Sequence, residues 1–589
     1  MSESANIARH LPLMAARQPE RAAVKVPRGR TADGRIDYLV LSFAEFDAEV
    51  DAWVAKLSDR GVRPGDRVLV MVRQGLPLIA AAFALFKLGA VPVIIDPGMG
   101  RKNFLACVAR SKPRVLLGIP FAQVMGHVFR SAFKTVEIRV WISSSTLARV
   151  GSSPSKIENQ NPKMIASAAS DLAAILFTSG STGAPKGVCY EHGMFEAQVR
   201  LVRDTYGIQP GEVDLPMLPI FALFNPALGM TTIVPEIDPS RPATVDPEKI
   251  VRAIQQEQVT SSFGSPTLWR KIARHCLANN ITLPSIKRVL LAGAPVPPSL
   301  FADLQKILPQ GTAHSPYGAT EALPICTISV DEVLGRQSSK TKTPDAKSQT
   351  PNPASLFGGW PLEFGTSAAT AAGHGTCVGR PVQDLTVKII PVADAPVSEI
   401  RELPAGEIGE IIVRGPVVTK TYDHLPEATA AAKIAAGQAV WHRMGDLGYL
   451  DASGRLWFCG RKAERVETKT GPLYTEQVEP IFNAHPNVAR SALIGTGHDG
   501  HRPAIVVEPV SREVVATPSL RRKLVRELRA LGAAHAHTDT IRLAYLHPYL
   551  PVDVRHNAKI HRLALARWAV GKHGYELDKR DIPSAAFKK

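Results

Sequence analysis

The run Ile175–Val188, ILFTSGSTGAPKGV, constrains the fold of this chain more than any other stretch. Its first residues, Ile175 to Phe177, predict the end of a buried strand. Small hydroxyl residues, glycines and one lysine follow: Thr178, Ser179, Gly180, Ser181, Thr182, Gly183 and Lys186. Such glycines let backbone N–H groups approach phosphate oxygens, while the hydroxyls add donors and the lysine adds a positive charge. A surface turn is the alternative, but the preceding strand and the offset of the lysine favour a phosphate-binding loop.

The spacing of this run excludes the most common nucleotide-binding loop. In the GxxxxGK[ST] pattern a glycine precedes the lysine, whereas here Pro185 does. We therefore do not expect an ordinary nucleoside triphosphatase fold.

Length and composition favour a multidomain globular protein. The chain has 589 residues, which exceeds one hydrophobic core, and 45% of them are hydrophobic against 21% charged. We find no apolar run of the ~18 residues that a membrane span needs, and charges interrupt the N-terminal sequence too often for a secretory signal. The six cysteines are scattered without a CxxC pair, so we expect reduced thiols in the cytoplasm and no structural zinc.

The net charge of +17 is uneven, with a basic excess after Arg512. A basic surface can suit nucleic acid, anionic lipid or anionic substrates. Because neither interleaved aromatic residues nor a nucleic-acid motif accompanies these charges, we expect a solvated basic face and no nucleic-acid partner. Peripheral contact with a membrane surface is the alternative.

The N-terminal half alternates short apolar runs with helical segments. Val68–Val72, Val91–Ile95 and Val115–Gly118 predict strands, and Leu78–Leu88 predicts a helix. Ser42, with a glutamate three residues later, is a plausible helix N-cap. This alternation predicts an α/β fold with parallel sheets.

The lysine-containing loop closely resembles the phosphate loop of the adenylate-forming superfamily, which includes acyl-CoA synthetases. The resemblance implies activation of a carboxylate by ATP to an acyl-adenylate, with Mg²⁺ as cofactor. It also implies a large N-terminal AMP-binding domain, residues 1–461, of parallel sheets with helices plus a small barrel-like sheet. A mobile α+β domain, residues 462–589, would follow a hinge at Lys462 and Ala463.

The same resemblance assigns roles to the later motifs. Lys186 and the loop would hold phosphates, and Glu321 would bind Mg²⁺ and act with Lys186 and Lys559 in catalysis. Tyr317, Gly318 and Thr320 belong to the same SPYGATE motif as Glu321, where Tyr317 would stack on adenine and Thr320 would donate to the α-phosphate. Nucleotide contacts would also come from Gly293, Ala294 and Pro295 beside adenine, and from Asp446 and Arg461 at the ribose.

The segment Leu215–Gly229 is apolar and contains three prolines. It is either a buried loop or, as the resemblance implies, the wall of an acyl pocket. It offers Phe221, Ala222, Leu223 and Phe224 and no histidine, so we expect a pocket that suits an alkyl chain. Residues 338–353, rich in Ser, Thr, Pro and Lys, instead predict a disordered surface insertion, with a partner-binding segment as the alternative.

Longer runs, among them LPIFALFNPALG and PVDVRHNAKI, resemble the olefin β-lactone synthetase branch of the superfamily. The branch activates a long-chain 2-alkyl-3-hydroxy acid, a β-hydroxy fatty acid, whose own hydroxyl then displaces AMP to close a β-lactone. Ala463, where relatives carry Asp or Lys, weakens the case for a large domain rotation. His556 is a candidate base for the hydroxyl, or a structural residue.

Two alternatives stay open. One is a medium- or long-chain acyl-CoA or acyl-AMP ligase, and the other is a catalytically silent nucleotide-binding protein. The branch resemblance further implies a thiolase-like condensing enzyme, a reductase and an α/β-hydrolase as functional partners.

Overall fold

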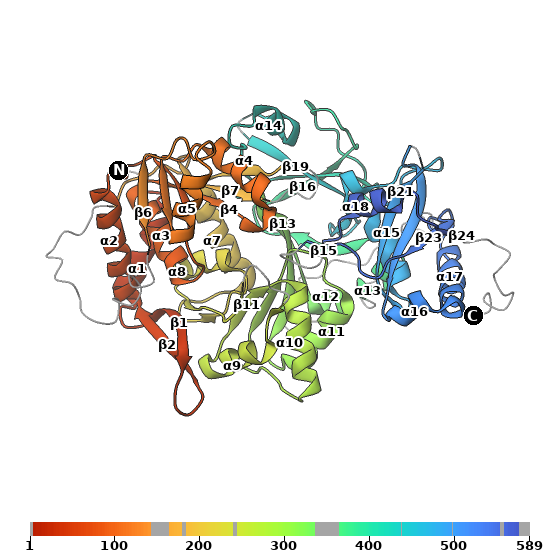
Figure 1. Ribbon diagram of the computed structural model, residues 1–589, viewed down its shortest axis with the longest axis horizontal. Helices are drawn as coiled ribbons and strands as arrows, with labels where there is room; N and C mark the ends of the chain where they lie inside the picture. Colours follow the sequence, from red (N-terminus) through yellow and green to blue (C-terminus); the bar gives the residue numbers. More distant parts are fainter. Residues whose placement is uncertain are drawn as a thin grey trace, which may run out of the picture.

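The structure, a computed structural model, describes residues 4–142, 164–178, 184–238, 244–335, 365–437, 439–497, 499–553 and 559–576. The predicted loop residues Ser179–Gly183, the candidate base His556 and the predicted insertion at 338–353 lie outside these ranges. The predicted α/β class with a small C-terminal α+β unit is confirmed (Figure 1).

One sheet carries the strand before the phosphate loop. Its strands follow the order β6 (Ile138–Trp141), β5 (Val115–Gly118), β3 (Arg67–Met71), β4 (Val91–Ile95), β7 (Leu172–Thr178) and β8 (Lys186–Glu191). The strands from β6 to β7 pair in parallel, as the alternating pattern predicts. β8 is antiparallel to β7, because a short loop rather than a crossover helix connects the two strands.

The larger sheet is mixed. Its order is β16 (Thr386–Ile390), β17 (Gly409–Arg414), β19 (Ala439–Leu450), β20 (Leu456–Arg461), β15 (Thr376–Pro381), β14 (Ala322–Ser329), β13 (Thr312–Ala319), β12 (Arg288–Leu291), β11 (Ser261–Gly264), β9 (Val213–Asp214), β10 (Thr231–Ile233), β1 (Ala22–Arg30) and β2 (Ile36–Ser42), with β18 (Lys433–Ala436) paired to β19. The expected small barrel-like sheet corresponds to the antiparallel strands β15 to β20. These strands are continuous with the rest, because β14 pairs with β15.

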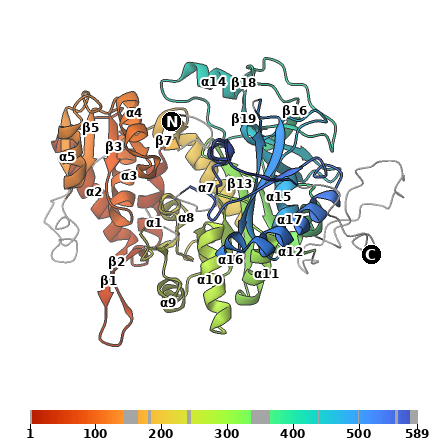
Figure 2. The same cartoon turned by 45° about the vertical axis from the view of Figure 1, so that its right-hand side comes forward.

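Helices separate and cover the two sheets. Between the sheets, a core is formed with α1 (His10–Arg17), α2 (Phe43–Asp59), α3 (Leu76–Leu88), α7 (His192–Tyr206) and α8 (Asn225–Leu228). Outside the first sheet lie α4 (Arg101–Ser111) and α5 (Pro120–Val128), and Figure 2 shows α5 on the outer side of β5 and β3. Outside the larger sheet lie α9 (Pro247–Glu257), α10 (Pro266–Ala278), α11 (Pro298–Ile307) and α12 (Val330–Leu334).

The local sequences of α2 and α3 agree with the observed helices. Ser42 accepts a hydrogen bond from the backbone N–H of Glu45, whose side chain accepts one from Ser42 N, so the predicted cap of α2 is a complete capping box. α3 is buried over nearly its whole length, which explains why its apolar residues show no single hydrophobic face.

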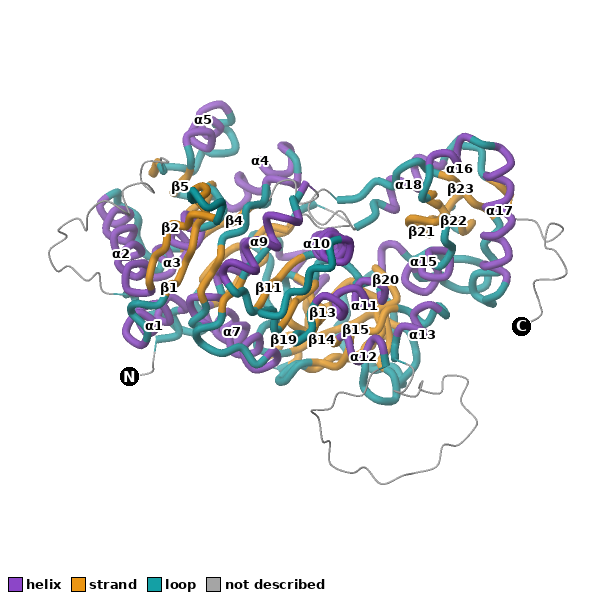
Figure 3. Tube along the Cα trace, turned by 90° about the horizontal axis from the view of Figure 1, so that it is seen from below, coloured by secondary structure: helices purple, strands orange, loops and turns teal. Residues whose placement is uncertain are grey.

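The chain after β20 forms a smaller unit with its own sheet, β21 (Val488–Thr496), β22 (Arg502–Pro509), β23 (Leu543–Leu546) and β24 (Tyr575–Glu576). Its helices are α15 (Thr475–Asn483), α16 (Arg512–Ala516), α17 (Pro518–Ala533) and α18 (Arg562–Ala569). Figure 3 shows α15 beside β20 and α13 (Ser367–Ala371). The boundary between residues 461 and 462 and the mobility of this unit stay predictions.

No helix of the described chain is long and apolar enough to cross a membrane.

Candidate nucleotide site

The β7–β8 hairpin positions Lys186 at the base of the predicted phosphate loop. Thr178 at the end of β7 pairs in register with Lys186 at the start of β8. The next residue must be small, because a Cβ atom on Gly187 would lie 2.8 Å from the ring of Phe177. The hairpin therefore fixes where the loop begins and where its lysine stands.

A second hairpin brings Thr320 and Glu321 to the site. They form the turn between β13 and β14, just beyond the paired residues Ala319 and Ala322. Three hydrogen bonds hold this turn. The Tyr190 hydroxyl donates to the carbonyl of Thr320, and the backbone N–H and the hydroxyl of Thr419 donate to the carbonyl of Glu321 at 2.9 and 3.1 Å. The SPYGATE motif is thus a strand and a tight turn.

Tyr422 links the glutamate to two lysines. Its hydroxyl donates to Oε1 of Glu321 at 2.7 Å, and burial followed by the Glu321 charge raises the pKa of the phenol. The Nζ of Lys186 lies 4.8 Å from the centre of the Tyr422 ring, and the Nζ of Lys433 lies 5.7 Å from it. Glu321 thus lies in a positively charged setting.

Asp446 and Arg461 are neighbours across a strand pair. They face each other in the register of β19 and β20, with Arg461 NH1 2.9 Å from Asp446 Oδ1. The Tyr317 hydroxyl donates to Asp446 Oδ2 at 2.6 Å. Oδ1 is buried and accepts no hydrogen bond of good geometry from the described residues, so the Arg461 ion pair is its main interaction.

The predicted adenine-side residues lie in an irregular turn. Gly293, Ala294 and Pro295 follow β12 and precede α11. Gly293 has φ +98°, a conformation that residues with a Cβ rarely adopt. The turn therefore exposes backbone with little side-chain bulk.

The C-terminal unit contributes Lys559. The backbone N–H of Asp553 donates to the carbonyl of Lys559, and the Lys559 N–H donates to the Asp553 carboxylate, both at 2.9 Å. Burial raises the pKa of Asp446, and the charges of Arg461 and Lys559 and the Tyr317 hydrogen bond lower it. Lys559 is therefore near enough to Asp446 for its charge to be felt at the nucleotide site.

Arg562 fixes this loop to the rest of its unit. Its guanidinium makes two hydrogen bonds of 2.7 Å to Glu479 in α15 and one of 2.8 Å to Glu464, just after β20. Because Glu464 lies two residues beyond Lys462, this arginine connects the Lys559 loop directly to the predicted hinge.

The predicted acyl-pocket residues lie in and just after the 3-10 helix η4 (Pro219–Leu223). The Phe221 ring stacks on Phe263 with centres 3.5 Å apart, and Ala222 is buried in the core between the sheets. The surroundings of Phe221, Leu223 and Phe224 are thus apolar, as the sequence predicts. Beneath them Asn225 donates to Asp214 at 2.9 Å, and burial raises the pKa of that carboxyl to about 7.

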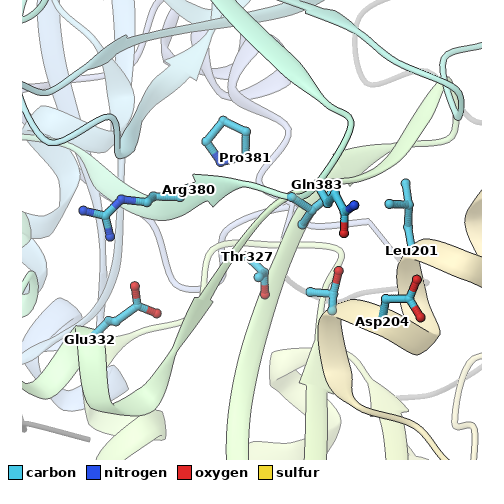
Figure 4. Close-up of a pocket in the computed structure, with 9 residues that line it drawn as sticks. Leu201, Asp204, Thr327, Glu332, Arg380, Pro381 and Gln383 are labelled. Atoms are coloured by element: carbon cyan, nitrogen blue, oxygen red, sulfur yellow. The ribbon is translucent and has the colours of Figure 1, made fainter. Parts of the chain in front are cut away.

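A separate hollow of about 350 Å³ lies between α7 and the β14–β15 strands (Figure 4). Charged and polar side chains line it, among them Asp204, Glu332 and Arg380. None of the predicted nucleotide residues borders it. We therefore place the candidate site at the tips of the β7–β8 and β13–β14 hairpins and not in this hollow.

The structure thus gathers Lys186, Glu321, Tyr317, Asp446, Arg461 and Lys559 from both parts of the chain. Sequence reasoning missed Tyr422 and Lys433, which also contact this cluster. Burial lowers the pKa of the Lys433 ammonium to about 7, while the Glu321 charge opposes this shift. A lysine at the start of the otherwise apolar run KIAA was the available signal.

Comparison with known proteins defines the class. A family model described as AMP-binding enzyme matches residues 13–423, so the chain belongs to the AMP-binding enzyme family. The predicted membership of the adenylate-forming superfamily, and with it an ATP-dependent, AMP-forming enzyme, is confirmed.

Two full-length relatives are more specific. The olefin β-lactone synthetase of Xanthomonas campestris pv. campestris is 44% identical, over 97% of this chain and 98% of that protein. The olefin β-lactone synthetase of Stenotrophomonas maltophilia is 43% identical, over 98% of this chain and 100% of that protein. The solved structure of amide bond synthetase McbA from Marinactinospora thermotolerans has the same fold, with a TM-score of 0.74 and 21% identity over 96% of this chain and 99% of that one.

Proposed function

We propose that this chain uses ATP to activate a long-chain 2-alkyl-3-hydroxy acid and then closes it to a β-lactone. The observation that carries the proposal is the similarity, over nearly the whole of each chain, to two proteins named olefin β-lactone synthetase. The apolar setting of Phe221, Leu223 and Phe224 supports an alkyl substrate.

In the first step a carboxylate oxygen of the acid attacks the α-phosphorus of ATP, and pyrophosphate leaves. Lys186 and the Ser179–Gly183 loop would hold the phosphates, and Asp446 with Arg461 would hold the ribose. A carboxylate at Asp446 can accept hydrogen bonds from ribose hydroxyls, and the Arg461 guanidinium lies beside it. Lys559 would stabilise the charge that moves between carboxylate, α-phosphate and pyrophosphate.

Mg²⁺ fits this site only as a metal shared with the nucleotide. The described residues hold no group of three or more His, Cys, Asp or Glu side chains that could bind a metal ion. Mg²⁺ is commonly held by one or two carboxylates together with substrate phosphates, and Glu321 offers one carboxylate beside Lys186. When bound there, Mg²⁺ would neutralise phosphate charge.

In the second step the 3-hydroxyl oxygen of the bound acyl-adenylate attacks the acyl carbon, and AMP leaves with a carboxylate oxygen. The hydroxyl proton passes to solvent or to a base, for which His556 is the candidate. An intramolecular nucleophile has a high effective concentration, so this step needs neither a thiol channel nor a second domain arrangement. Ala463, in place of the Asp or Lys of relatives, agrees with that requirement.

A β-lactone product requires other enzymes before and after this one. A condensing enzyme of the thiolase-like type and a reductase would supply the hydroxy acid, and an α/β-hydrolase would act on the lactone. We propose these as functional partners, with the cytoplasm as the location.

The product mass tests the proposal. With ATP, Mg²⁺ and a 2-alkyl-3-hydroxy acid, the product should weigh the acid minus one water, with and without coenzyme A. A 3-deoxy acid should stall as the acyl-adenylate because it lacks the nucleophile. A thioester as the main product would instead support the acyl-CoA ligase alternative, and ATP binding without pyrophosphate release would support the silent binding protein.

A further inference from the structure

Lys433 stands at the nucleotide site without a carboxylate partner. It begins β18, and its Nζ donates to the carbonyl and, at 3.2 Å, to the hydroxyl of Thr419. Within the described chain, the structure records no carboxylate within ion-pair distance of this ammonium. A lysine that is mostly removed from water and lacks an anion is unfavourable unless something else offsets its charge.

The nearest acid does not neutralise Lys433. Oε1 of Glu321 accepts the Tyr422 hydroxyl, and Tyr422 presents its ring face to both Lys433 and Lys186. Contact with an aromatic ring compensates an ammonium only in part. Two lysines therefore share one ring next to one engaged carboxylate, and a bound anion would favour the charged form of Lys433.

The neighbouring strand does not supply an anion either. His442 pairs with Lys433 across β18 and β19, and it is buried. Its Nδ1 contacts the carbonyl of Ala432 at 3.2 Å. Because a carbonyl only accepts, Nδ1 carries the proton of a neutral ring. Burial, Lys433 and Lys186 lower the pKa of His442, so its ring adds no charge of its own near neutral pH.

We propose that Lys433 binds the β- and γ-phosphates of ATP, and then the pyrophosphate, as a second lysine opposite Lys186. This rests on the proposed function, because it assumes that ATP occupies the site. The Tyr422 ring spaces the two ammonium groups, and Thr419 aims Lys433. A polyphosphate supplies negative charge to this lysine pair, whereas AMP, which ends at the α-phosphate, does not reach Lys433.

Calorimetry on the full chain, without acid substrate, tests the proposal by comparing the binding affinities of ATP and AMP. Lys433→Met should weaken binding of MgATP and of magnesium pyrophosphate by roughly 10–100-fold, the usual effect of losing a hydrogen bond to a charged group. Binding of AMP should stay within about twofold of wild type. Lys433→Gln, which can still donate to Thr419, should give the same pattern if Lys433→Met folds poorly.

A matched control is Lys420→Met, in the same segment. Lys420 is half-exposed and pairs with Glu191 at 2.7 Å, and this variant should bind all three ligands as wild type does. Equal weakening of ATP and AMP would assign Lys433 a structural role, and unchanged affinity for ATP and pyrophosphate would also overturn the proposal. If the wild-type protein forms no lactone while the variants show the predicted difference between ATP and AMP, the proposed substrate is rejected and the Lys433 site stands.

Discussion

Lys559 is exposed to solvent, yet its charge acts on the buried carboxyl of Asp446. Most exposed lysines only extend over the surface with their charge in water. Here the side chain comes from the C-terminal unit and faces a site built by the other unit. The resemblance to adenylate-forming enzymes predicts that this charge acts where the carboxylate attacks.

Lys559→Ala should lower the rate of acyl-adenylate formation by about 10²–10³, the usual effect of removing one transition-state stabiliser. ATP affinity should change little, because the large domain supplies the other proposed nucleotide contacts. A preformed acyl-adenylate should still close to the lactone. The measurements are pyrophosphate release and conversion of added adenylate, with exposed Lys572→Ala as the control. Adenylate formation at the wild-type rate in Lys559→Ala would show that this lysine is only a surface residue.

Helix α18 begins with Arg562, which connects the C-terminal unit to the predicted hinge through Glu464. Arg562→Met should lower the free energy of unfolding of the C-terminal unit by about 3–5 kcal/mol, because it leaves the buried Glu479 and the partly buried Glu464 without their shared cation. Arg567→Met, at an exposed position of the same helix α18, should change it by less than about 0.5 kcal/mol. Denaturant unfolding measures both, and equal effects in the two variants would contradict the role of the buried pair.

Asp214 in β9 and Asn225 in α8 form a buried polar pair near the predicted acyl-pocket residues. Asp214 is buried, and burial raises its pKa from an ordinary 3.8 to about 7, so the folded state holds the proton more tightly than the unfolded chain. Its contribution to stability is therefore lost as pH rises from about 4 to 7.

Asp214→Asn should remove this pH dependence. Relative to wild type, the variant should gain on the order of 2 kcal/mol in unfolding free energy between pH 5 and pH 8. Denaturant melts at the two pH values measure the gain, and exposed Asp59→Asn is the control. A constant difference between Asp214→Asn and wild type at both pH values would show that Asp214 does not titrate in this range.

At the scale of the whole molecule, sequence periodicity predicted elements that depend on local pattern. The strands at Val91–Ile95 and Val115–Gly118 have the predicted ends, and the helix at Leu78–Leu88 begins only two residues earlier. Sheet order was not predictable, because it depends on pairing between distant segments. The antiparallel strands β8 and β14 were not predicted either, although each pairs with the strand before it in the sequence.

The site was predictable only in part. Glycines, a lysine and an acid at ordered positions pointed to Lys186, Glu321, Asp446 and Lys559. Lys433 and Tyr422 were missed because their role depends on β18 pairing with β19 and on the loop that follows β17. The Arg562 anchor was missed for the same reason, since Glu464 and Glu479 are far from it in the sequence.

The central claim is that the carboxylate is activated and the substrate's own hydroxyl displaces AMP. A single turnover with a 2-alkyl-3-hydroxy acid labelled with ¹⁸O in both carboxylate oxygens tests it directly by mass spectrometry. We predict one ¹⁸O in AMP and one in the lactone, because one carboxylate oxygen leaves with AMP and the ring oxygen comes from the hydroxyl. Unlabelled AMP together with a lactone that keeps both labels would contradict the account, since it would mean that the hydroxyl and not the carboxylate had been activated.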